Sequence, residues 1–87
     1  MPREQVRRLV IDAAVARLEV DRTVLHDDAD FAALGVDSLA LVEFALSLED
    51  VFDVEMPEEE VVDLTSVGRL VDALVLKTAV RAAGPAS

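Results

Sequence analysis

The sequence contains no cysteine and no tryptophan or tyrosine, and its aromatic side chains are limited to Phe31, Phe44 and Phe52. Without cysteine it can form neither a disulfide framework nor a thiolate metal site, so helix packing must supply its stability. This composition fits a reducing cytoplasm, where we expect the protein to reside. Apolar runs are only a few residues long and no hydrophobic segment of signal-peptide length follows the charged residues 1–8, so we expect neither a signal peptide nor a membrane span.

Basic residues are also scarce, with 8 Lys and Arg against 18 Asp and Glu and a net charge of -10. The stretch between Arg22 and Arg69 has none, although most of the acidic residues lie there. Nucleic acids and anionic membranes bind proteins largely through phosphates paired with Lys and Arg, so we expect neither as a partner. Basic protein surfaces are the natural counterparts, although charge alone fits a merely solvated surface equally well.

The spacing of apolar residues predicts an all-α fold in a single domain with a modest aliphatic core. Helices are expected over residues 4–18 and 38–52 and again from Val67, where Thr65 or Ser66 can cap the last one. Pro57 and the acidic residues after it predict a short third helix ending near Asp63. The result is an irregular four-helix bundle, with residues 1–81 as the domain and residues 82–87 as a frayed tail. Nothing demands a dimer, so we expect a monomer.

Residues 21–37 lack a helical period and predict a long loop between the first and second helices. Loops of this length inside compact domains are uncommon and tend to be functional. Asp30 is placed to cap a short turn within this loop. Isolated apolar residues should anchor the loop to the core: Val24, Leu25, Phe31, Leu34 and Val36.

The second helix carries two apolar stripes, where a helix at the edge of a small bundle needs only one. On a helical wheel of about 100° per residue, the core-facing stripe contains Leu41, Phe44, Ala45, Leu48, Val51 and Phe52. Three further apolar residues, Leu39, Val42 and Leu46, lie on the opposite side of the helix among acidic residues. Any one of the three could pack against the long loop or the third helix, but together they have the form of a docking surface for a partner rich in Arg and Lys. The expected docking residues are Leu39, Val42, Glu43, Leu46, Glu49 and Asp50.

The segment Gly35-Val36-Asp37-Ser38-Leu39 leads into this helix, with Asp37 placed to cap it. It resembles the phosphopantetheine attachment motif of acyl carrier proteins: a Gly, one residue, then Asp-Ser-Leu at the start of the second helix. The resemblance covers residues 31–75 specifically and the first helix more loosely. It implies that Ser38 bears a covalent 4′-phosphopantetheine, transferred from coenzyme A by a phosphopantetheinyl transferase. A helix N-terminus favours the negatively charged phosphate of this arm. Gly35 leaves room for the arm and permits a tight turn.

The resemblance implies a protein that catalyses nothing itself. It would hold acyl intermediates as thioesters on the arm at Ser38 and present them to acyl-transferring or synthase enzymes with basic docking patches, in fatty acid or polyketide-type biosynthesis. Many fatty-acid carriers have a second acid where this sequence has Ala40. The abundance of Ala, Val and Arg with a single Lys indicates a GC-rich bacterial genome, which favours secondary metabolism.

Other kinds of site find little support in the sequence. His26 is the only histidine, so no catalytic triad can be assembled, and a lone loop histidine more often lies at the surface or packs. An EF-hand beginning at Asp28 would need other residues than Ala32, Ala33 and Leu39 at three of its positions.

Two alternatives to an acyl carrier stay open. An aminoacyl or peptidyl carrier shares the fold and the serine, although its motif usually has Gly or His where this chain has Val36-Asp37. An unmodified acidic interaction module would bind a basic partner through Leu39, Val42 and Leu46, and Ser38 would then be dispensable.

Overall fold

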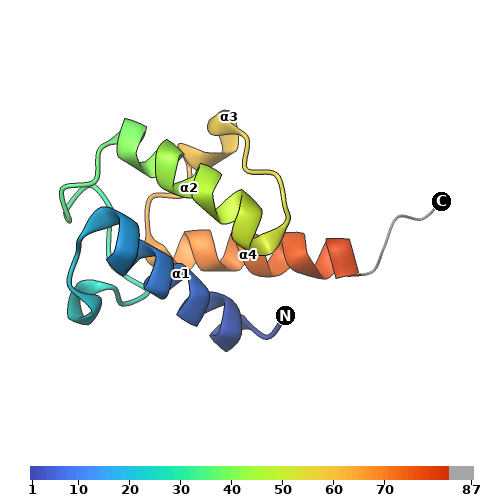
Figure 1. The fold of residues 1–87 in the computed structure, drawn as a ribbon. Helices are drawn as coiled ribbons and strands as arrows, with labels where there is room; N and C mark the ends of the chain where they lie inside the picture. Colours follow the sequence, from blue (N-terminus) through green and yellow to red (C-terminus); the bar gives the residue numbers. More distant parts are fainter. Residues whose placement is uncertain (83–87) are drawn as a thin grey trace.

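A computed structural model describes residues 1–82 of the chain, which form four α-helices and one 3₁₀ turn. They are α1 (Arg3–Leu18), η1 (Arg22–Val24), α2 (Ser38–Phe52), α3 (Glu58–Val61) and α4 (Val67–Ala82). Figure 1 shows α1, α2 and α4 as long helices, with the short α3 beside α2 and the long loop joining α1 to α2. This confirms the predicted all-α bundle. Of the expected tail, Ala82 ends α4 and residues 83–87 lie outside the described part.

The helix boundaries follow from local capping groups. Asp37 accepts a hydrogen bond from the Ala40 amide at 2.7 Å and so begins α2. The Ser66 hydroxyl accepts from the Arg69 amide at 3.2 Å and begins α4. At the end of α2, Asp53 adopts the left-handed conformation at φ 55° and turns the chain away.

The core lies between α1, α2 and α4, and α3 packs on α2. Phe31 and Phe44 meet at its centre edge to face, with ring centroids 6.3 Å apart. Two expected core positions are wrong. Val51 is 47% exposed, because it lies at the margin of the core-facing stripe in the last turn of α2. Val24 is 38% exposed, because the 3₁₀ turn η1 directs it outwards, whereas Leu25 beside it is buried.

The long loop crosses the start of α4 and satisfies its unpaired amides. The amides of Val67 and Gly68 donate to the carbonyls of Ala29 and Asp27 at 3.0 and 2.9 Å. The first amides of a helix have no partner within it, so these bonds join loop and helix into one unit. Gly68 suits this close approach, because a Cβ there would lie 3.0 Å from the Asp27 carbonyl oxygen and would push the loop away by a few tenths of an ångström.

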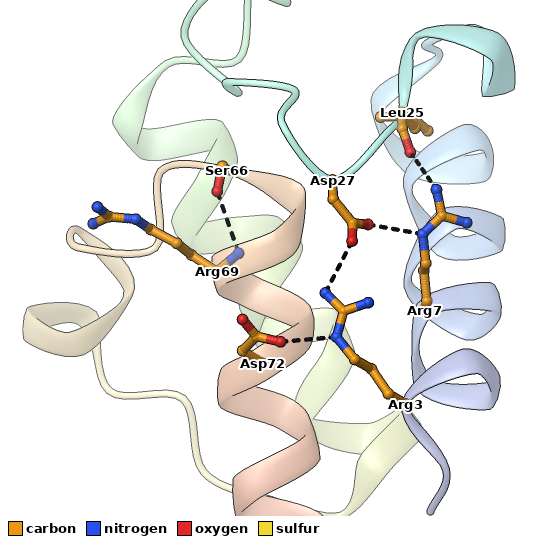
Figure 2. A network of polar contacts seen from close by, with 7 residues as sticks. All are labelled: Arg3, Arg7, Leu25, Asp27, Ser66, Arg69 and Asp72. Atoms are coloured by element: carbon orange, nitrogen blue, oxygen red, sulfur yellow. Dashed lines mark hydrogen bonds and ion pairs between the residues drawn. The ribbon is translucent and has the colours of Figure 1, made fainter.

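Ion pairs join the same loop to α1, and α1 in turn to α4, as Figure 2 shows. The Asp27 carboxylate lies 2.8 Å from Arg7 Nε and 3.1 Å from Arg3 Nη2. Arg3 also reaches Asp72 on α4 at 2.8 Å, and Arg7 donates to the Leu25 carbonyl at 3.4 Å. The hydrogen bond from Arg7 is the main cause that lowers the pKa of Asp27, and Arg3 adds to it. Residues from α1, the loop and α4 are therefore tied together at one point.

Candidate functional site

Ser38 is the first residue of α2, and the turn before it determines how it is presented. Gly35 has φ +85° and donates to the Ala32 carbonyl, while Val36 donates to that of Phe31 at 2.9 Å. This pattern is a Schellman-type reversal, in which a glycine takes the left-handed position. It buries Val36 in the core and leaves Asp37 and Ser38 exposed.

The first turn of α2 keeps unpaired donors beside the Ser38 hydroxyl. Asp37 binds the Ala40 amide through its side chain and the Leu41 amide through its carbonyl. Within residues 1–82, the amides of Ser38 and Leu39 and the Ser38 hydroxyl have no hydrogen-bond partner in the protein. Free amides and the positive end of the helix dipole favour a negative group, so these residues fit a phosphodiester at Ser38.

The structure refines the reason for a glycine at position 35. A Cβ added to Gly35 would meet nothing within 4 Å, so space alone does not require a glycine. The positive φ does, because an L-residue is strained in this conformation.

The six expected docking residues do not all lie free on the surface of α2. Leu39 and Leu46 are 66% and 50% exposed, and Glu43 and Asp50 are exposed beside them. Val42 is half-buried and faces a pocket towards α3. Glu49 is half-buried too, and its Oε2 accepts a hydrogen bond from the Met56 amide at 2.7 Å.

An apolar pocket of about 150 Å³ opens beside Ser38, between α2 and α3. Its walls include Phe31, Leu41 and Val42 from the loop and α2, and Val61 and Val62 from α3. Sequence reasoning did not assign the α3 valines to the site. The apolar pair directly after the acidic run of α3 is the signal that could have found them.

A second hollow, of about 210 Å³, borders α2 on its α1 side. It is lined by Arg17, Leu18, Ala40, Glu43 and Phe44. Arg17 and Leu18 come from the end of α1, which sequence reasoning did not connect with the site. The exposed face of α2 thus has an apolar pocket on one side and a polar-edged hollow on the other.

Other parts of residues 1–82 offer no comparable chemistry. A wider groove of about 670 Å³ lies between α4, α3 and the loop after α2 and includes none of the expected site residues. His26 is exposed, and no group of three or more His, Cys, Asp or Glu in the described part is placed to hold a metal ion. Over the same residues, no helix has the length and apolarity needed to cross a bilayer.

The sequence is similar to known proteins over most of its length. Residues 8–74 match the family described as "Phosphopantetheine attachment site". The chain is 37% identical over 76 residues to the acyl carrier protein of Clostridium acetobutylicum, covering 86% of this chain and 94% of that protein. It is 32% identical over 78 residues to that of Chlorobium phaeobacteroides, covering 88% of this chain and all of the relative. The acyl carrier protein of Rubrobacter xylanophilus is 37% identical over 76 residues, 86% of this chain and 94% of that protein.

Proposed function

Since the chain belongs to the acyl carrier protein family, whose members are carriers and not catalysts and bear a covalent 4′-phosphopantetheine, we propose that Ser38 is the attachment residue. The observation that carries this proposal is the exposed Ser38 hydroxyl at the first turn of α2, beside two unpaired amides. When bound, the arm supplies a terminal thiol that holds an acyl group as a thioester. Asp37 caps α2 and so keeps Ser38 at the N-terminus of this helix.

Acyl carrier proteins work with acyl-transferring and synthase enzymes, and we propose that these bind the exposed face of α2. Leu39 and Leu46 supply the apolar centre, while Glu43 and Asp50 attract a basic surface and orient it. Val42 acts as a wall of the apolar pocket, and Glu49 contributes negative charge while its Oε2 accepts from the Met56 amide. A monomeric state and a cytoplasmic location stay predictions from the sequence.

The pocket beside Ser38 supports a role in holding short aliphatic groups. A cavity of about 150 Å³ accommodates a ligand of about six carbon atoms.

We propose that the pathway is polyketide-type secondary metabolism, on the strength of Ala40 and the composition of the chain. Loading tests with fatty acyl, malonyl and amino acid donors distinguish the alternatives, and loading by amino acid donors alone would identify a peptidyl carrier instead.

Intact mass spectrometry tests the assignment of Ser38. After incubation with coenzyme A, magnesium and a phosphopantetheinyl transferase, the wild-type protein should gain the mass of one phosphopantetheine, and Ser38→Ala should gain none. Ser47→Ala is the matched control and should gain the same mass as wild type. The Ser47 hydroxyl lies in the same helix but donates a hydrogen bond to the Phe44 carbonyl. An unchanged wild-type mass would favour the unmodified interaction module.

A further inference from the structure

The hollow between α1 and α2 is lined by one basic side chain, Arg17 from α1, and one acidic side chain, Glu43 from α2, which form no ion pair with each other. Arg17 is the only basic residue in its lining, and no carboxylate within residues 1–82 lies within 4 Å of it in an ion pair. Helix α2 itself contains no Lys or Arg. Arg17 is therefore a single cation at the margin of a strongly acidic face.

This hollow lies close to the residue on which partner enzymes act. Ala40 follows Ser38 by two residues in the same helix, which is a rise of about 3 Å along the axis. Glu43 belongs both to the hollow and to the exposed face of α2. An enzyme that covers this face while it reaches Ser38 must also cover the hollow, whose remaining walls include the half-buried Leu18 and the buried Phe44.

We propose that enzymes docking on α2 insert an acidic side chain into this hollow, where its carboxylate pairs with Arg17. The inference rests on the proposed function, because it concerns partners that act at Ser38. A uniformly basic enzyme surface would be attracted to this protein in many orientations. Along α2 a carboxylate of the enzyme meets only Glu43 and Asp50, which repel it, whereas on the α1 side of the hollow it meets Arg17, so that a single orientation is favoured.

A purely structural role for Arg17 makes a different prediction. Arg17 lies in the last turn of α1, where a cation interacts favourably with the helix dipole. If Arg17 has only that role, its substitution should change the melting temperature of the carrier and leave enzyme binding unchanged. If Arg17 pairs with a partner, its substitution should change how strongly enzymes bind.

Arg17→Glu and Arg8→Glu form a matched pair of variants. Both arginines are exposed on α1, neither has an ion-pair partner within residues 1–82, and both changes alter the net charge equally. Long-range attraction alone would make both variants bind a basic enzyme as well as wild type, or better. The proposal predicts instead that Arg17→Glu raises the KM for the carrier at least about tenfold, with kcat unchanged, while Arg8→Glu changes it by less than about twofold.

Two enzymes serve as probes: a phosphopantetheinyl transferase acting on the apo-protein, and an acyltransferase that moves malonyl groups from malonyl-CoA to the holo-protein. Equal KM values for the two variants with both enzymes would overturn the proposal. So would a KM effect that disappears once matched fractions of folded protein are compared. If Arg17→Glu still becomes fully modified at Ser38 on long incubation, the proposed function stands whatever the outcome for Arg17.

A cross-linking experiment identifies the paired group directly. In Arg17→Lys, a zero-length carbodiimide reagent should join the introduced amine to an Asp or Glu of the bound enzyme, as mapped by peptide mass spectrometry. Arg8→Lys is the control and should give no such product. Absence of any cross-link at position 17 with both enzymes would contradict the inference.

Discussion

Ser38 is presented by its neighbours, and each of them acts through a different physical effect. Gly35 supplies a backbone conformation, with φ +85°. Asp37 supplies an acceptor for the Ala40 amide at 2.7 Å, and Val36 anchors the turn in the core. The position of the hydroxyl is therefore controlled by residues that need never touch the arm.

Replacing Gly35 should lower stability without blocking modification. In Gly35→Ala the left-handed conformation costs about 1–2 kcal/mol, measured as the free energy of unfolding in urea. Gly35→Asn should lose less, because Asn tolerates this region better than Ala. Both folded variants should still accept the arm, because a Cβ at this position meets nothing within 4 Å. Equal stability of all three proteins would show that the turn is not strained.

Substitutions at Glu43 and Glu49 should distinguish an effect on partner docking from an effect on the stability of the fold. Glu49→Ala leaves the part-buried Met56 amide without its acceptor and should cost about 1–3 kcal/mol in urea unfolding. Glu49→Gln keeps an acceptor oxygen and should lose much less. Glu43→Lys reverses an exposed charge, so stability should change by less than about 0.5 kcal/mol while the KM with a phosphopantetheinyl transferase rises. A pure loss of stability in Glu43→Lys would contradict its docking role.

The residues at the start of α2 could be assigned from the sequence because their contacts are local. A cap such as Asp37 bonds three residues ahead, within its own helix. The hollow beside Arg17 and the bond from the Met56 amide to Glu49 could not be predicted from the sequence, since they depend on how α1 and the α2–α3 loop fold against α2. Helical periodicity reports which side of α2 a residue occupies, but not what covers that side.

At the level of elements, the long loop behaves as part of the α4 N-terminus. Its carbonyls bind the amides of Val67 and Gly68, and the Asp27 carboxylate joins it to α1. The sequence predicted the helices and the loop well, since caps and apolar periods are local signals. It could not predict this clamp, because Arg3, Arg7 and Asp72 are brought to Asp27 only by tertiary packing.

Asp27→Asn should destabilise the protein at neutral pH by about 1 kcal/mol, as expected for the loss of two partly exposed ion pairs. The folded state lowers the pKa of Asp27, so its stabilising effect is complete above the unfolded value near 3.9. The effect is lost as the pH falls below that value and through the folded pKa. Urea unfolding should therefore show a constant difference between wild type and Asp27→Asn from pH 7 to pH 5, and a shrinking one below about pH 4.

Asp28→Asn is the control for this pH series. Asp28 is the exposed neighbour of Asp27 and takes part in no ion pair within residues 1–82. Its stability should follow that of wild type at neutral pH. A gap between wild type and Asp27→Asn that persisted at pH 2 would point to a packing effect of the substitution instead.

Across the whole molecule, charge is divided unevenly between the elements. The ion pairs of the described part involve bases from α1, η1 and α4, because α2 and α3 contain none. Glu60 of α3 pairs with Lys77 of α4, but Glu43 and Asp50 on the exposed face of α2 take part in no ion pair within residues 1–82. The face that is proposed to attract basic enzymes is also the face where self-repulsion in the free protein is concentrated.

Salt should consequently move stability and partner binding in opposite directions. The molecule measures 42 × 25 × 20 Å, so at about 10 mM salt, with a screening length of about 30 Å, its acidic residues repel one another across much of the structure. At about 150 mM this length is about 8 Å, so repulsion weakens while the ion pairs lose less. The melting temperature should rise by roughly 4–8 °C for each kcal/mol of repulsion removed, and kcat/KM with a phosphopantetheinyl transferase should fall at least about tenfold. Choline chloride in place of sodium chloride should reproduce both trends if screening is the cause, and a melting temperature that fell with salt would show that the ion pairs outweigh the repulsion.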